Sequence, residues 1–133
     1  MKQPYSDLSQ FSILIVDDVP LNVLLVEKML ARFNFRVRTA ANGEEALAQM
    51  QEEKPDLVFL DILMPVMDGF QVLEAARKQV EWADVRIVVL SALDSNQDIV
   101  RAFNLGANDF ITKPIILSKL LSTIAEQLRI PLT

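Results

Sequence analysis

Short runs of hydrophobic, often β-branched residues alternate five times along the chain with longer segments whose hydrophobic positions recur at helical spacing. The runs predict strands at 12–16, 35–39, 56–60, 86–90 and 110–112, each followed by a helix. Such alternation is typical of βαβ units, in which helices cover both faces of a parallel sheet. We therefore predict a doubly wound α/β domain.

Several residue types indicate where the helices begin, end and face the core. Pro20 suits the first turn of a helix, Asn34 tolerates the left-handed conformation that often closes one, and Asn42 can cap the next helix. Two apolar stripes are expected to face the core, one in the first helix (Leu21, Leu25, Met29, Leu30) and one in the last (Leu117, Leu120, Leu121, Ile124, Leu128).

The composition fits a single domain. We expect a lead-in at 1–10, the domain itself at 11–129, and a tail or the start of a linker at 130–133. No apolar stretch approaches the ~18 residues of a membrane span, and the N-terminus lacks the apolar core of a signal peptide, which predicts a cytoplasmic protein. A net charge of −5 without a basic run argues against nucleic-acid binding by this domain.

Four of the predicted strands end in groups that a phosphoryl-transfer site would need. Asp17 and Asp18 follow the first strand, Asp61 the third, Ser91 the fourth and Lys113 the fifth. A parallel sheet gathers the carboxyl ends of its strands at one edge, so these side chains are expected to meet. The chain contains no cysteine and no histidine, and clustered carboxylates suit a hard cation such as Mg²⁺.

The same residues resemble the receiver domain of two-component response regulators, of the CheY-like superfamily. The resemblance rests on Asp61-Ile-Leu-Met-Pro-Val-Met-Asp-Gly69, together with Val16-Asp-Asp18, Ser91-Ala92 and Lys113-Pro114, and it covers about residues 11–129. It implies a flavodoxin-like sheet of five parallel strands in the order 2-1-3-4-5.

The resemblance also implies a role for each site residue. Asp61 would accept a phosphoryl group from a sensor histidine kinase or a histidine phosphotransfer protein, while Ser91 and Lys113 would meet the phosphoryl oxygens. Mg²⁺, or Mn²⁺ in its place, would be held by Asp17, Asp18, Asp61 and the backbone carbonyl of Leu63. Asp68 and Gly69 are expected to build a turn rather than to touch phosphate.

A conformational switch is implied as well. In the family an aromatic residue turns inward when the hydroxyl residue moves toward phosphate, and here these positions hold Phe110 and Ser91. The alternative is that Phe110 is simply a core residue. The bond between Lys113 and Pro114 is expected to be cis. Leu63 and Leu93 occupy the positions best placed to control a hydrolytic water, and neither side chain can orient one by hydrogen bonding.

Two surfaces are candidates for partners. Val23 and Leu24 fall outside the predicted core stripe, so the first helix is expected to carry extra apolar surface, unless these residues pack in the core. In receiver domains this helix and the loop after the Lys-Pro pair meet the kinase or phosphotransfer protein, so the resemblance implies docking by Pro20, Leu24, Pro114 and Ile115. A phosphorylation-dependent dimer is a further possibility. In winged-helix relatives an arginine of the last helix pairs across such a dimer, and we place Thr123 at that position.

Two other functions compete with this reading. One is a receiver-fold interaction domain that works without phosphorylation, and its usual sign would be the loss of an acid, the hydroxyl or the lysine, none of which is lost. The other is a flavin-binding electron carrier on the same architecture, where Asp17 and Asp18 would repel the flavin phosphate. The output domain or protein is not specified by the residues.

Overall fold

A computed structural model of the chain describes residues 7–132. Five parallel strands form one sheet in the order β2-β1-β3-β4-β5, which confirms the predicted flavodoxin-like order. The strands are β1 (Ser12–Val16), β2 (Arg36–Ala40), β3 (Leu57–Leu60), β4 (Arg86–Ser91) and β5 (Asp109–Thr112). The helices are α1 (Pro20–Leu30), α2 (Gly43–Glu52), α3 (Gly69–Arg77), α4 (Asn96–Asn104) and α5 (Leu117–Leu128), with a short 3-10 helix at Val80–Trp82.

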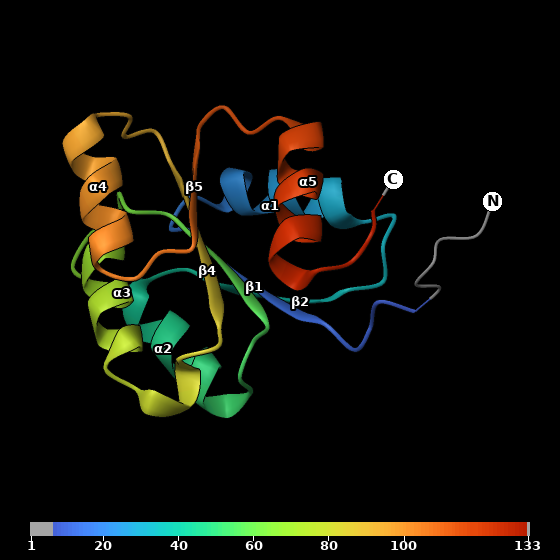
Figure 1. The fold of residues 1–133 in the computed structure, drawn as a ribbon, viewed down its shortest axis with the longest axis horizontal. Helices are drawn as coiled ribbons and strands as arrows, with labels where there is room; N and C mark the ends of the chain where they lie inside the picture. The colour runs from blue at the N-terminus through green and yellow to red at the C-terminus, as the bar shows by residue number, and fades with distance from the viewer. Residues whose placement is uncertain (1–6, 133) are drawn as a thin grey trace.

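Helices cover both faces of the sheet, with α1 and α5 on one side and α2, α3 and α4 on the other (Figure 1). Successive residues of β1 point to opposite faces, so that Ile13 and Ile15 pack toward α1 and α5 while Leu14 and Val16 pack toward the other layer. All five residues of β1 are buried, as expected for a central strand of a parallel sheet. Within residues 7–132 no helix is both long enough and apolar enough to cross a membrane.

The face of α1 that packs on the sheet differs from the prediction. Leu21 and Leu25 are 62% and 50% exposed, whereas Val26 and Leu30 are buried and Val23 packs against the same core. The predicted stripe was therefore wrong at its first two positions. The physical reason is that α1 is apolar around most of its circumference, so hydrophobic spacing alone does not select the face that meets the sheet.

Asn34 does not close α1 as predicted, since the helix ends at Leu30. Its side chain instead accepts a hydrogen bond from the amide of Leu8 at 2.7 Å. Leu8 and Ile130 both lie outside the predicted range 11–129, yet both are buried in the core between the sheet and α1 and α5. Packing therefore extends beyond that range at each end. The proposed cap of α2 is confirmed, because the Asn42 side chain accepts from the amide of Glu45.

Arg77, at the end of α3, joins three segments at the amino edge of the sheet. Its guanidinium donates to the carbonyl oxygens of Gly106 and Trp82, each at 3.0 Å, and to Oδ1 of Asn108 at 2.9 Å. The Asn108 oxygen also accepts from the amide of Ile87 at 2.7 Å. Arg77 thus fixes the loop between α4 and β5 to α3 and β4.

One residue of the loop between β3 and α3 has an unfavourable backbone conformation. Val66 has a φ of 68° and its side chain is 94% exposed. A β-branched residue is strained at such an angle because its Cβ approaches the backbone. No packing of the exposed side chain offsets this strain.

Candidate functional site

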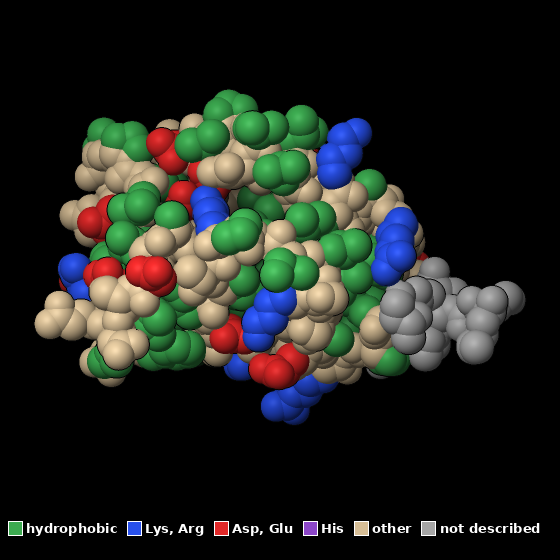
Figure 2. Space-filling model, turned by 90° about the horizontal axis from the view of Figure 1, so that it is seen from above, with side chains coloured by type: hydrophobic (Ala, Val, Ile, Leu, Met, Phe, Trp, Pro, Cys, Tyr) green, Lys and Arg blue, Asp and Glu red, His purple; other side chains and the backbone are tan. Residues whose placement is uncertain are grey.

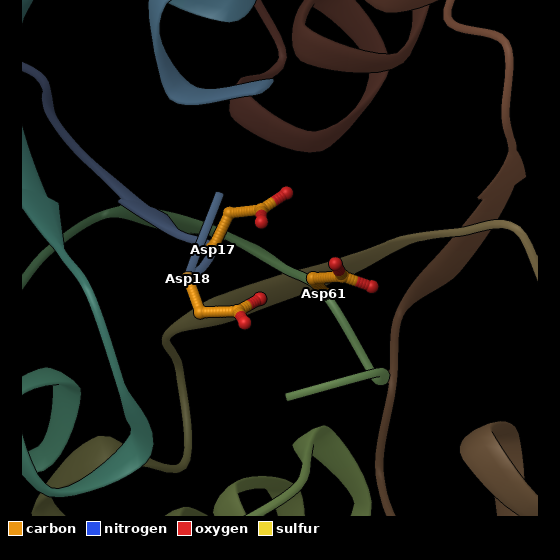
Figure 3. A group of neighbouring side chains, drawn as sticks. All are labelled: Asp17, Asp18 and Asp61. Atoms are coloured by element: carbon orange, nitrogen blue, oxygen red, sulfur yellow. The ribbon is translucent and has the colours of Figure 1, made fainter. Parts of the chain in front are cut away.

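Three carboxylates meet at the carboxyl edge of the sheet, where the sequence predicts them. Asp17 and Asp18 project from the end of β1 and Asp61 from the end of β3, and all three turn toward the same space (Figure 3). One oxygen of each carboxylate lies within 4.8 Å of one oxygen of the other two. Carboxylate oxygens at this spacing can share one hard divalent cation.

Asp17 and Asp61 are held in similar ways. Both are buried, and each uses Oδ1 to accept a nearby backbone amide: Val19 at 2.9 Å for Asp17, and Leu63 at 3.1 Å for Asp61. The Oδ2 atoms remain for Lys113, whose Nζ lies 3.2 Å from Asp17 and 3.3 Å from Asp61. Each carboxylate is therefore oriented by its own turn, and both face the Lys113 ammonium.

The site carries more negative than positive charge. Lys113 supplies one positive charge against three acids, and Oδ1 of Asp18 is buried without a hydrogen-bond partner within residues 7–132. Burial raises the pKa of Asp61, and Asp17 raises it further, while the Lys113 ammonium lowers it. An added cation would reduce the repulsion between the three carboxylates and would give Oδ1 of Asp18 a partner. The residues present therefore fit a bound metal ion.

Ser91 ends β4 and Lys113 follows β5 at the same edge of the sheet as the acids. Ser91 is fully buried, and its Oγ accepts a hydrogen bond from the amide of Leu93 at 3.2 Å. The amide of Lys113 donates to the carbonyl of Ser91 at 2.9 Å, so the two strand ends are directly connected. The Lys113–Pro114 peptide bond is cis, as predicted.

The residues assigned to the switch and to water control differ in exposure. Phe110 is half-buried and packs against the core on the α3 and α4 side, so the structure places it partly in the core and partly at the surface. Leu63 is 52% exposed. Leu93 is half-buried and packs against the same core as Phe110, so of these two leucines only Leu63 matches an ordinary exposed position.

The predicted docking residues lie along two separate grooves. Leu24 is 46% exposed and lines a groove of about 440 Å³ with Pro20, Asp17 and Asp18. Pro114 and Ile115 line another, of about 510 Å³, together with Lys113 and Leu25. Seen from the carboxyl edge of the sheet, hydrophobic side chains gather beside acidic and basic ones (Figure 2). Sequence reasoning missed Leu25 because it assigned that residue to the core.

The position assigned to a dimer contact is not at the surface. Thr123 is 2% exposed and faces the core from α5. Its Oγ1 is buried and has no hydrogen-bond partner among the described residues. Thr123 lies on the same face of α5 as Leu120 and Ile124, so equating it with the surface arginine of winged-helix relatives was wrong.

Comparison with known proteins places this geometry in context. Residues 13–125 match the family described as the response regulator receiver domain. Response regulator PleD of Caulobacter vibrioides is 40% identical over 77% of this chain, which spans only 23% of that relative's length. Protein PilH of Pseudomonas aeruginosa is 37% identical, and the match covers 84% of this chain and 93% of PilH.

Solved structures have the same fold. Chemotaxis protein CheY4 of Vibrio cholerae superposes with a TM-score of 0.82 at 32% identity, covering 87% of this chain and 97% of CheY4. A complex of CheX and CheY from Borrelia burgdorferi, described with BeF3 and magnesium, gives a TM-score of 0.80 at 33% identity and covers 89% of both chains.

Proposed function

Since this chain belongs to the response regulator receiver domain family and is a phosphorylation-switched signalling module of two-component systems, we propose that Asp61 is the residue that takes up the phosphoryl group. One observation carries the assignment. Asp61 is the acid of the cluster that follows the central strand β3, and its Oδ2 lies 3.3 Å from Nζ of Lys113. A phosphoryl group on Oδ2 of Asp61 would lie beside the lysine.

The proposed transfer leaves little covalent chemistry to the protein. An oxygen of Asp61 forms a bond to phosphorus while the bond from phosphorus to the donor's imidazole nitrogen breaks; the imidazole leaves, and Asp61 becomes a mixed acyl phosphate. Charge in the transition state is spread over three equatorial oxygens, so catalysis is mainly positioning and neutralisation. Lys113 would meet one oxygen, and Ser91 Oγ with nearby amides another.

The acids would hold the metal ion of the reaction. Asp17, Asp18, Asp61 and the carbonyl of Leu63 are the proposed oxygen ligands, and the buried, unpaired Oδ1 of Asp18 supports this set. A hard ion with all-oxygen ligands indicates Mg²⁺, with Mn²⁺ as a substitute. When bound, the ion neutralises phosphoryl oxygens and the like charges of the acids.

The remaining expectations follow from this proposal. The donor is a sensor histidine kinase or a histidine phosphotransfer protein, and docking involves Pro20, Leu24, Pro114 and Ile115. The phosphorylated form acts on an output domain or protein and returns to the resting form by hydrolysis at Asp61. A phosphorylation-dependent dimer and a cytoplasmic location stay predictions from the sequence.

The test is labelling by a small phosphodonor. Asp61→Asn should abolish labelling by acetyl phosphate in the presence of Mg²⁺, and a chelator should do the same to the parent protein. Asp84→Asn is the matched control, because Asp84 is an exposed acid paired with Lys54 rather than a member of the site. Labelling of the Asp61 variant at the parent's level would refute the assignment. Incubation with FMN tests the flavin alternative in parallel.

A further inference from the structure

Gly69 begins α3 at the place where this helix meets the turn that carries Asp61. The amide of Gly69 donates to the carbonyl oxygen of Ile62 at 2.9 Å. The preceding residue, Asp68, caps the helix by a reciprocal pair of hydrogen bonds with Gln71. The hydrogen bond from Gly69 to Ile62 therefore fixes the first turn of α3 directly against the backbone that follows Asp61.

There is no room for a side chain at this position. A Cβ atom added to Gly69 would lie 2.6 Å from Cα and 2.7 Å from Cδ1 of Ile62, and closer still to the carbonyl oxygen of Asp61. Real Cβ atoms essentially never approach other atoms within 3.0 Å. Gly69 does not have a positive φ, so it is space that requires a glycine here. Because two of the three neighbours are backbone atoms and Ile62 is 2% exposed, relief requires movement of the chain itself.

Movement of the backbone at Asp61 and Ile62 would also displace the site groups of Asp61 and Leu63. The carbonyl of Ile62 accepts the amide of Met64 at 3.0 Å as well as that of Gly69, so both ends of this turn depend on one oxygen. Leu63 lies inside the turn, and its amide orients the Asp61 carboxylate at 3.1 Å. Displacing Asp61 or Ile62 would therefore displace the carboxylate and the carbonyl of Leu63 together.

We propose that Gly69 is a positioning residue for phosphorylation, which allows α3 to lie against the turn at 61–63 and thereby sets the Asp61 carboxylate opposite Lys113. This inference rests on the proposed role of Asp61. It assigns to Gly69 a part in the reaction that its place in a turn does not imply. The group that acts on the phosphoryl oxygens remains elsewhere, and Gly69 acts only through the backbone of Asp61 and Ile62.

Gly43 offers a matched control. A Cβ atom there would also be crowded, at 2.7 Å from Sδ of Met67 and 2.8 Å from Cγ2 of Val72, but these are side-chain atoms. Gly43 is the first residue of α2, and the three atoms nearest to its added Cβ belong to Met67 and Val72 rather than to the turn at 61–63. Alanine at either glycine should lower stability, whereas only alanine at Gly69 should move Asp61.

The experiment compares Gly69→Ala and Gly43→Ala with the parent. We expect Gly69→Ala to slow labelling by acetyl phosphate at saturating Mg²⁺ by about tenfold or more, because small displacements of reacting groups are costly. Calorimetric titration of the unphosphorylated protein should show weaker Mg²⁺ binding. Gly43→Ala should melt at a lower temperature and keep the parent's rate and Mg²⁺ affinity.

A double variant separates positioning from packing. Adding Ile62→Val to Gly69→Ala removes the Cδ1 overlap but leaves the backbone overlap, so the thermal melting point should recover in part while labelling stays slow. Recovery of the rate together with stability would overturn the proposal, as would Gly69→Ala with the parent's rate and Mg²⁺ affinity. Failure of the parent itself to label would instead count against the proposed role of Asp61.

Discussion

The ammonium nitrogen of Lys113 lies 3.3 Å from Oδ2 of Asp61, although 52 positions separate the two residues in the chain. This ion pair does not fully compensate for the burial of Asp61, because desolvation and the neighbouring Asp17 raise the pKa of the Asp61 carboxyl more than Lys113 lowers it. The ionised form of Asp61 is therefore less favourable in the folded domain than in water, and a bound cation would stabilise it.

A change in stability with pH should follow. An acid whose pKa is raised in the folded state contributes stability below its ordinary pKa of 3.8 and loses that contribution as pH rises through the raised value. Asp61→Asn should therefore unfold at a higher urea concentration than the parent at pH 7 in chelator, and the difference should shrink toward pH 4. A variant less stable than the parent at pH 7 would show that the ion pair with Lys113 outweighs burial.

Phosphorylation should alter the loops after β4 and β5 more than the rest of the domain. Ser91 Oγ now accepts from Leu93, and the Ser91 carbonyl accepts from Lys113, so contact with phosphate would disturb both loops. Hydrogen exchange with and without beryllofluoride should change at 91–97 and 109–116 and stay constant in α2. Ser91→Ala should weaken the response while keeping some labelling. Equal exchange in both states would favour the phosphorylation-independent function.

Docking of the phosphodonor should distinguish the two grooves. Leu24→Glu and Leu25→Glu change leucines of similar exposure, 46% and 50%, on different sides of α1. If a groove docks the donor, its variant should slow transfer from a phosphorylated kinase that labels the parent, with acetyl phosphate labelling and melting unchanged. Ile115→Glu should also reduce stability, because Ile115 is half-buried against the core. Normal transfer to all three variants would place docking elsewhere.

The lifetime of the acyl phosphate should depend on Leu63 and Leu93. Neither side chain can hold an attacking water, so polar replacements such as Leu63→Asn with Leu93→Glu should shorten the lifetime several fold. Phosphate release from purified phosphoprotein at fixed Mg²⁺ and pH measures this. Because Leu93 is half-buried, each single variant is followed as well, with its melting curve. Unchanged decay in all variants would show that water access is controlled by other residues.

Relief of strain should stabilise the loop before α3. Val66→Gly removes the Cβ at a φ of 68° and should raise the free energy of unfolding by about 1 kcal/mol. Val80→Gly is the control, since Val80 is 86% exposed but has no positive φ, and glycine there should give no gain. Chemical denaturation of the two variants checks the difference. A loss of stability for Val66→Gly would mean that entropy of the unfolded chain outweighs the strain.

The sequence allowed a prediction of which side chains lie at the carboxyl edge of the sheet, because each of them follows a predicted strand. Each of the groups at Asp17, Asp61, Ser91 and Lys113 follows a short hydrophobic run, and a parallel sheet leaves one place for strand ends to meet. The prediction failed where the pattern is ambiguous. Leu25 and Val23 are equally apolar, so only the packing of α1 shows that the first is exposed and the second is not.

The sequence also did not predict contacts between residues that lie far apart in the chain. Nothing in the letters Asp68-Gly69 distinguishes an ordinary turn from a helix start that leaves no space beside the Asp61 carbonyl. Likewise, an arginine at the end of α3 reads as a solvated helix terminus, whereas Arg77 is enclosed by three acceptors brought together by the fold. Such roles depend on distances between elements, which local periodicity does not contain.

The hydrogen bonds of Arg77 hold the carboxyl end of α4 in place. They anchor the chain at Gly106, directly beyond the last turn of α4, while the first turn of that helix, at Ser95, adjoins the loop that begins at Ser91. Because one end of the helix is held, a displacement of α4 should increase with distance from Gly106. A small shift of Ser91 toward phosphate would therefore displace the first turn of α4 more than the last turn, which lies next to the hydrogen bond from Arg77 to Gly106.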